Sequence, residues 1–399
     1  MHNTLKNYFQ KYNLDALLIS DLNNVRYLSN FTGTNGMILA TPTRGYFFTD
    51  FRYTEQAAEQ VKWFKVVTSS RDIYPDIKKI LEGGKIIPIL PWRKIEDPRF
   101  RRTGIGIRLG FEAGATNYAQ FLRLQKSLDG IKLVPVTDDP ALLRVVKNKN
   151  EITKIERALK INKLAFEEVR PKIKPGKTEI EIKTMLEIAM LKHGADKIAF
   201  DTIVASGWRG ALPHGVASHK KIRAGELVTI DFGCVSEGYN SDETVTVLVG
   251  EPDLSLPSPL PRRGSRSSSP RQRGGREERY RRQQLEIHQI VFEAQRLAIA
   301  AARPGAKCSD LDKAARDYIT QKGYGKYFGH ALGHGVGLEV HERPVLSPNS
   351  TDVLEEGMVF TIEPGIYIPK FGGVRIEDVF VCTKSGVKQL SKINKKLGA

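Results

Sequence analysis

The sequence predicts an α+β protein with two domains, a smaller α/β domain over residues 1–139 and a larger domain over residues 140–399. The length of 399 residues favours two domains over one. The first part alternates short apolar runs with amphipathic stretches, whereas the second combines long amphipathic segments with strand-like runs that glycines interrupt. Between the two parts, Asp138, Asp139 and Pro140 are typical turn residues and set the boundary.

In the first domain, three short apolar runs predict strands, namely DALLIS (residues 15–20), GMILAT (36–41) and GYFFTD (45–50). The second domain opens with an amphipathic run over residues 150–169, which predicts a helix. Thr178 and Glu181 have the spacing of a capping box and predict the start of the next helix. Its predicted buried face carries Ile182, Leu186 and Ala189.

Strand-like runs follow over residues 227–233 and 240–250, and the closing segment over residues 358–383 is again β in pattern. Between them, residues 285–319 predict two helices that Pro304 and Gly305 separate. No apolar run reaches the ~20 residues that span a bilayer, and the first residues lack the apolar stretch of a signal peptide, so we expect a cytoplasmic protein. The three scattered cysteines indicate buried thiols rather than a disulfide framework.

The formal net charge of +17 raises the question of a nucleic-acid partner. Part of it lies in residues 251–282, which hold nine arginines against four acidic residues and are rich in Ser, Pro and Gly. Such a composition predicts a disordered insertion, because it offers almost nothing to a core. An arginine-rich tract can bind RNA through its phosphates, but a solvated surface loop is the interpretation that we favour.

Two of the β segments can be folded as hairpins that bring carboxylates together. A turn between Ser236 and Glu237 would place Asp231 opposite Asp242, and a turn centred on Lys370 would place Glu363 opposite Glu377. Opposed residues have Cβ atoms ~4.5–5.5 Å apart. Carboxylates that close repel each other unless a proton or a cation neutralises them, so the two pairs predict a metal site.

A glycine-rich stretch, GHALGHGVGLEVHERP (residues 329–344), adds His330, His334 and His341. Imidazole is a common metal ligand and a common acid or base near neutral pH. Four carboxylates with one imidazole suit two divalent ions, and the oxygen-rich set favours manganese or cobalt, with zinc as an alternative.

The motifs TIDFG, SDET, GHGVGLEVHE, TIEPGIY and GGVRIED occur in this order, and together they resemble the signatures of the pita-bread metallopeptidases. Within that family the chain most resembles Xaa-Pro aminopeptidases and prolidases. The first domain, with DALLISDLNNVRYLSNFTG and YFFTDFRYTEQA, resembles the creatinase-type domain that precedes the catalytic one. The resemblance therefore covers nearly the whole chain and implies a creatinase-type domain followed by a pita-bread catalytic domain.

This resemblance implies a role for each candidate residue. The implied ligands of two metal ions are Asp231, Asp242, His334, Glu363 and Glu377. The other implied active-site residues are His341 near the tetrahedral intermediate, His214 at the substrate carbonyl, His330 as an accessory residue and Arg375 as a brace for the carboxylates. In the implied reaction a metal-bridging hydroxide attacks an Xaa-Pro peptide bond, and Glu363 carries the proton to the leaving nitrogen.

Several alternatives stay open at this point. The chain has Val345 where some dipeptidases of the family place an arginine for the substrate carboxylate, which favours an Xaa-Pro aminopeptidase over a prolidase. Non-catalytic pita-bread modules that bind nucleic acid or proteins usually lack ligands that this chain retains. Creatinase uses no metal, and methionine aminopeptidase lacks the first domain. The expected partners are proline-containing peptides and a second copy of the chain in a homodimer.

Overall fold

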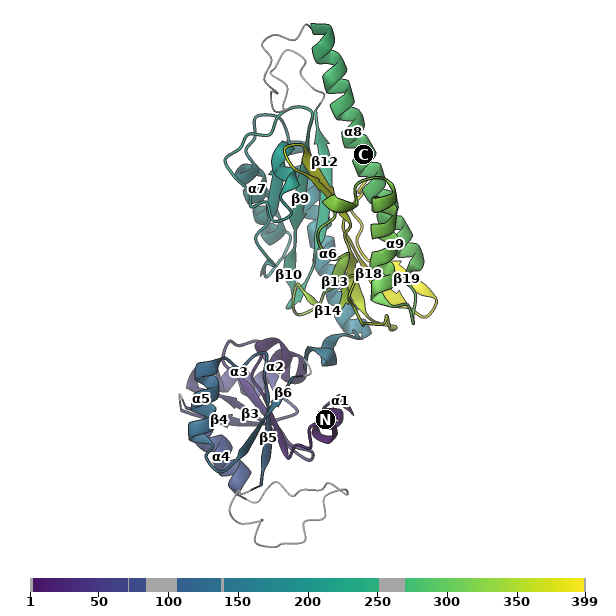
Figure 1. Cartoon of the computed structure of the whole chain (residues 1–399). Coiled ribbons are helices and arrows are strands. Elements are labelled where there is room, and N and C mark those ends of the chain that lie inside the picture. Colours follow the sequence, from purple (N-terminus) through teal and green to yellow (C-terminus); the bar gives the residue numbers. More distant parts are fainter. Residues whose placement is uncertain (1–2, 71, 84–105, 138–139, 251–269, 398–399) are drawn as a thin grey trace. The chain divides into compact units, whose positions relative to one another are not determined.

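A computed structural model describes residues 3–70, 72–83, 106–137, 140–250 and 270–397 (Figure 1). The chain divides into two compact units, Met1–Arg144 and Val145–Ala399. The division lies five residues beyond the boundary that the sequence suggests. No helix within the described ranges has both the length and the apolar character needed to cross a membrane.

The first unit is a six-stranded mixed sheet with helices on both faces. Its strand order is β4-β3-β2-β1-β5-β6. The strands are β1 (Ala16–Ile19), β2 (Met37–Ala40), β3 (Gly45–Thr49), β4 (Lys65–Thr68), β5 (Arg108–Glu112) and β6 (Lys132–Val136). The helices are α1 (Asn3–Lys11), α2 (Leu22–Ser29), α3 (Thr54–Gln60), α4 (Tyr74–Glu82) and α5 (Tyr118–Ser127). Leu17 and Ile19 of β1 enter one core and Ala16 and Leu18 enter another, so both faces of the sheet are buried, as the α/β prediction requires.

In the described part of the second unit, four long helices lie against several small antiparallel sheets. The helices are α6 (Lys149–Val169), α7 (Glu179–Lys192), α8 (Pro270–Ala301) and α9 (Cys308–Gln321). One three-stranded sheet has the order β12-β9-β8, with β8 at Ile203–Ser206, β9 at Glu226–Phe232 and β12 at Glu243–Val249. A second has the order β11-β10-β7, with β7 at Lys197–Ile198, β10 at Cys234–Ser236 and β11 at Tyr239–Asn240.

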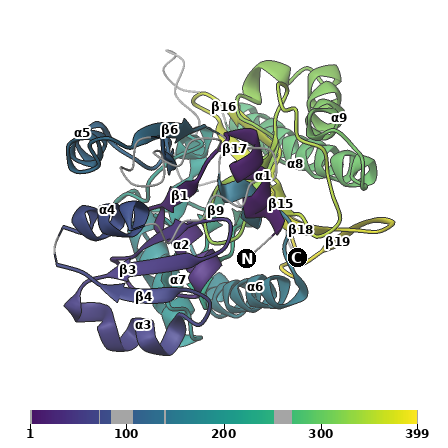
Figure 2. The ribbon, with the colours of Figure 1, turned by 90° about the horizontal axis from the view of Figure 1, so that it is seen from below.

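The remaining strands belong to the C-terminal part of the chain. A five-stranded sheet has the order β14-β13-β15-β18-β19 and is built from β13 (Gly333–Gly335), β14 (Glu342–Leu346), β15 (Val359–Ile362), β18 (Asp378–Thr383) and β19 (Gly386–Gln389). A two-stranded ribbon pairs β16 (Gly365–Ile368) with β17 (Gly372–Arg375). Helices α8 and α9 lie side by side (Figure 1 and Figure 2) and share one core with the C-terminal strands. Helices α6 and α7 share a second core with β9 and β12.

The helix starts in this unit follow the sequence signals. Thr178 Oγ1 accepts from the Glu181 backbone N–H at 3.2 Å, and a carboxylate oxygen of Glu181 accepts from the Thr178 backbone N–H at 2.8 Å. The predicted capping box is therefore confirmed. Helix α6 covers the predicted range of 150–169 and has a capping box of its own, formed by Asn148 and Glu151.

The hairpin that carries Asp231 and Asp242 turns one residue later than predicted. Its turn residues are Glu237 and Gly238, which both have positive φ angles, 51° and 84°. This is the geometry of a type I′ turn. Asp231 therefore lies opposite Thr244, and the predicted direct pairing of Asp231 with Asp242 is wrong. Because Asp242 is two residues from Thr244, it still falls on the face of the sheet that Asp231 occupies.

The second hairpin has the predicted register. Its three-residue loop is centred on Lys370, which has a φ of 65°. Two pairs of opposed residues flank the glutamates and are symmetric about Lys370, namely Gly365 with Arg375 and Ile362 with Asp378. Glu363 and Glu377 lie between these pairs and are therefore opposite each other, as predicted.

The basic insertion is only partly described. Residues 251–269 lie outside the described residues, and their disorder stays a prediction. Residues 270–282 belong to α8, and the prediction that the loop extends to residue 282 is wrong. The ring of Tyr280 packs against Phe371 with centroids 4.7 Å apart, and its hydroxyl donates to the Phe371 carbonyl at 3.1 Å. This contact with a distant hairpin fixes α8 at Tyr280, within the range that composition alone predicts to be a loop. The three cysteines are buried free thiols, as expected.

Candidate metal centre

All nine candidate residues from the sequence line one cavity of about 420 Å³ in the second unit. They are His214, Asp231, Asp242, His330, His334, His341, Glu363, Arg375 and Glu377. The remaining wall is largely apolar and comes from Phe200, Ile203, Pro213, Val216, Ala331 and Val340, with Asp201 beside them. The cavity thus combines a charged floor with apolar sides, a common arrangement in ligand sites.

The five predicted ligands come from the ends of strands in two sheets. Asp231 lies near the end of β9 and Asp242 directly precedes β12, whereas His334 lies in β13. Glu363 directly follows β15, and Glu377 directly precedes β18. The backbone N–H of Glu377 donates to the Thr244 carbonyl at 3.2 Å, which joins the two sheets beside the site.

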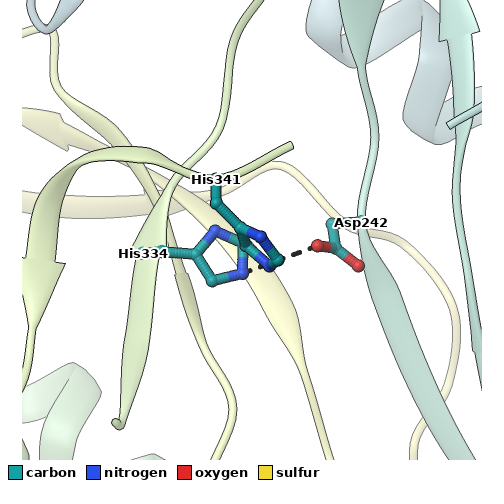
Figure 3. A group of neighbouring side chains, drawn as sticks. All are labelled: Asp242, His334 and His341. Carbon is teal, nitrogen blue, oxygen red and sulfur yellow. Dashed lines mark ion pairs between the residues drawn. The ribbon is translucent and has the colours of Figure 1, made fainter. Parts of the chain in front are cut away.

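Among the described residues, three groups of side chains could hold a metal ion, with ligand atoms within 4.8 Å of one another. The groups are Asp242 with His334 and His341, His334 with Glu363 and Glu377, and Asp231 with Asp242 and Glu377. Figure 3 shows the first group, in which His334 Nε2 faces Asp242 Oδ2 at 3.6 Å and the His341 ring stands edge to face on His334. Because the groups overlap, the five predicted ligands surround one continuous space.

His334 has the hydrogen-bond arrangement of a metal ligand. Its Nδ1 lies 3.1 Å from the Gly335 carbonyl, and since a carbonyl can only accept, Nδ1 carries the proton. Nε2 faces Glu363 Oε1, at 3.2 Å, and Asp242 Oδ2; it donates to Glu363 when the ring is protonated, and its lone pair would bind a metal ion when the ring is neutral. Fixing one ring nitrogen on a carbonyl so that the other can bind a metal is a recurrent device in metalloproteins.

The negative charges of the buried carboxylates are only partly neutralised by positively charged side chains of the protein. Burial, followed by repulsion from neighbouring carboxylates, raises the pKa of Asp242 and of Glu377 well above the usual range. Burial also raises the pKa of Asp231 although Arg375 opposes it. Burial acts in the same direction on Glu363, but the hydrogen bond and charge of His334 outweigh it and leave that pKa lowered. Asp231 Oδ1 is buried without a hydrogen-bond partner. This set of groups fits divalent cations, which supply the missing positive charge.

Arg375 braces two of the carboxylates. Its guanidinium donates to Asp231 Oδ2 at 2.5 Å and, through Nε, to Thr244 Oγ1 at 3.0 Å. Thr244 Oγ1 in turn donates to Glu377 Oε2 at 2.8 Å. The geometry therefore agrees with the bracing role expected of Arg375, and it adds Thr244 as an intermediary that the sequence did not reveal.

His330 is held on both of its ring nitrogens. Nδ1 lies 2.7 Å from the Ala331 carbonyl and so carries the proton, and Nε2 accepts from the Tyr367 hydroxyl at 2.8 Å. Tyr367 also accepts from Arg375 Nη1 at 2.9 Å. Burial lowers the pKa of His330, so the ring is a fixed, neutral part of the wall. Tyr367, in the motif TIEPGIY, escaped sequence reasoning because its role depends on this packing.

His214 and His341 differ from His330 because both are exposed within the cavity. Burial of part of its ring and the nearby His334 lower the pKa of His341. Both rings are thus accessible to a bound molecule, whereas His330 is committed to protein contacts.

Comparison with known proteins agrees with this architecture. The chain matches the family described as metallopeptidase family M24 over residues 153–384 and the creatinase/prolidase N-terminal domain over residues 1–146. It is 38% identical over 392 residues to the Xaa-Pro dipeptidase of Pyrococcus horikoshii, covering 98% of this chain and 96% of that protein.

Two solved structures resemble the whole chain. The Xaa-Pro dipeptidase from Bacillus anthracis matches with a TM-score of 0.83 and 38% identity, covering 98% of this chain and 97% of the other. The X-Pro aminopeptidase from Thermotoga maritima matches with a TM-score of 0.79 and 35% identity, covering 97% and 98%. The predicted creatinase-type domain and pita-bread domain are confirmed, and the chain belongs to metallopeptidase family M24, a family of peptidases that depend on two metal ions.

Proposed function

We propose that the protein is an Xaa-Pro dipeptidase that depends on two divalent metal ions. The observation that carries the proposal is the convergence of five ligand-type side chains in one cavity, in a chain similar over nearly its whole length to a protein named Xaa-Pro dipeptidase. The relatives thus favour the prolidase alternative over the aminopeptidase that the sequence suggested first.

Val345 was the reason for that first preference. It pairs with His334 across β13 and β14 and brings no cation. The cavity nevertheless contains the exposed imidazole of His214, which can donate to a carboxylate. A dipeptide therefore has a candidate partner for its C-terminal carboxylate without an arginine at position 345.

Asp231, Asp242, His334, Glu363 and Glu377 would hold the two ions. Their four carboxylates and one imidazole form an oxygen-rich set, which favours manganese or cobalt, with zinc as the alternative. When bound, the ions would supply a nucleophile derived from water at neutral pH and polarise the scissile carbonyl.

The protein's own groups account for the remaining steps. The Glu363 carboxylate faces the cavity and would take the proton of the attacking water and pass it to the proline nitrogen as the amide bond breaks. The His341 imidazole would donate to the oxyanion that forms on the carbonyl oxygen when the carbonyl carbon is attacked. His214 would contact the substrate, and the apolar wall at Phe200 and Ile203 would receive an apolar part of the peptide. Arg375 would keep Asp231 and Glu377 in place.

The test is a comparison of substrates with metal-depleted protein to which manganese, cobalt or zinc is returned. An Xaa-Pro dipeptide, an Xaa-Pro-Yaa tripeptide and an Xaa-Ala dipeptide are each assayed. We expect cleavage of the first, little of the second and none of the third, with full loss of activity in a chelator. Preference for the tripeptide would establish the second candidate, an Xaa-Pro aminopeptidase, which the similarity to the Thermotoga maritima structure favours.

The homodimer stays a prediction, which the mass of the protein in solution would test.

A further inference from the structure

A lysine near the C-terminus is buried on the opposite side of the metal-site strands from the cavity. The Lys395 side chain is only 4% exposed. Its Nζ lies 3.2 Å from Glu243 Oε1 and 3.7 Å from Asp378 Oδ1. Both acidic side chains are buried as well, and Asp378 Oδ1 makes no hydrogen bond. A buried ammonium thus stands between two buried carboxylates that have no role in the proposed chemistry.

The two carboxylates are direct sequence neighbours of two proposed ligands. Glu243 follows Asp242, and Asp378 follows Glu377. Successive side chains along extended chain point to opposite sides, so Asp242 and Glu377 enter the cavity while Glu243 and Asp378 point away from it toward Lys395. One ammonium therefore links the two chain segments that carry these ligands.

Those segments belong to different sheets. Glu243 begins β12, in the sheet of β9, whereas Asp378 begins β18, in the five-stranded sheet. Next to the site they are joined by the hydrogen bond from the Glu377 N–H to the Thr244 carbonyl. A second tie at Lys395 would restrict the separation and the angle of the two segments, on which the distance between the two ligand carboxylates depends.

Lys395 is itself fixed by its surroundings. Two residues of the same C-terminal segment bond to β18, since Ser391 Oγ accepts from the Val379 N–H at 2.7 Å and the Leu390 N–H donates to the Val379 carbonyl at 2.8 Å. The Lys395 carbonyl accepts from His288 Nε2 of α8 at 3.2 Å. The ammonium is therefore held at a defined point, as a positioning group must be.

Stability alone gives a weak reason for this arrangement. Burying an ammonium and two carboxylates carries a large desolvation cost, and apolar replacements of such clusters are often neutral or stabilising. A lysine near a metal site also repels the metal ions. Retaining a cation here is easier to understand if it controls geometry.

We propose that Lys395 is a positioning residue for the metal centre: its ammonium ties Glu243 to Asp378 and thereby sets Asp242 and Glu377 at the spacing that two divalent ions require. The inference rests on the proposed function in that it concerns the same site, and it deepens that proposal by extending the site to the C-terminal segment.

The experiment measures manganese binding to metal-depleted Lys395→Met by calorimetry, and hydrogen exchange of the Glu377 amide in the metal-free protein. Positioning predicts that the manganese dissociation constant rises at least tenfold and that the Glu377 amide exchanges faster. A charge effect alone predicts the opposite for binding, because removal of a nearby positive charge strengthens the attraction for a cation. The sign of the change therefore separates the two explanations.

The matched control is Lys220→Met, which removes the lysine of another largely buried ion pair, with Glu226 at 2.6 Å, at the far end of β9 from Asp231. We expect it to lower stability and to leave the manganese dissociation constant within twofold of the wild type. If Lys395→Met does not fold, Lys395→Gln replaces it, since glutamine also removes the positive charge and a charge effect alone still predicts tighter manganese binding.

An unchanged or lower dissociation constant together with unchanged exchange at Glu377 would overturn the proposal. The amide measurement uses no metal and no substrate. If the wild-type protein binds manganese but cleaves neither the Xaa-Pro dipeptide nor the Xaa-Pro-Yaa tripeptide, the proposed function is refuted. The proposal about Lys395 is then still decided by the manganese dissociation constants and the exchange rates of the Glu377 amide.

Discussion

His288 allows a quantitative prediction of how stability depends on pH. The side chain is 5% exposed in α8 and contacts the Lys395 carbonyl. Burial lowers its pKa from 6.5 to about 4, although the hydrogen bond to the carbonyl opposes the shift. A histidine whose pKa is lowered by folding takes up its proton more readily in the unfolded chain. Its favourable effect is therefore fully present above pH 6.5 and is lost as the pH falls toward 4.

The magnitude follows from the two pKa values. The fall of the His288 pKa from 6.5 to about 4 corresponds to roughly 3.4 kcal/mol of stability in the limit of low pH. Between pH 8 and pH 5 the linkage relation gives a loss of about 2 kcal/mol from this group. His288→Gln keeps a neutral hydrogen-bond donor, so the free energy of unfolding of the variant should fall about 2 kcal/mol less than that of the wild type over this range. Urea titrations at both pH values measure the difference, and equal losses in the two proteins would refute the reasoning.

Three further predictions concern the site and the insertion. Glu363→Gln should reduce kcat by about 10²–10⁴-fold, the usual range for loss of a general acid or base, and a kcat within tenfold of the wild type would rule out the proton-transfer role. Arg375→Met should destabilise the metal-free protein by about 3–5 kcal/mol, because it leaves the Asp231 carboxylate buried without its cation. Denaturant midpoints measured with and without manganese test this, and bound manganese should restore part of the lost stability. Deletion of residues 255–268 should leave peptidase activity unchanged, and loss of RNA binding at low salt in the same variant would assign that tract a second role.

Local sequence signals predicted much of the second domain. The capping box at Thr178 and Glu181 defined a helix start, since both partners lie within one turn. The register around Lys370 followed from the spacing of two glutamates in a hairpin with a short loop. The two-sided sheet of the first domain followed from short, continuously apolar strands.

The errors arose where the conformation of one residue or a distant contact decides the structure. The turn before Asp242 depends on Glu237 adopting a positive φ, which a glutamate rarely does and which no pattern signals. Within α8, Tyr280 contacts Phe371 of a later hairpin, and no local pattern signals this contact. Thr244 and Tyr367 join the site only because folding brings Arg375 between them.

The anchoring of α8 also bears on how this chain can change over evolutionary time. Strand β12 ends at Val249, and the chain is fixed again at Tyr280 and at Gln284, whose amide donates to the Gly225 carbonyl. Insertions, deletions and new charges between these points arise between two ends that the core holds independently. Changes in the length and charge of the chain between Val249 and Tyr280 can therefore accumulate without altering the positions of the proposed metal ligands.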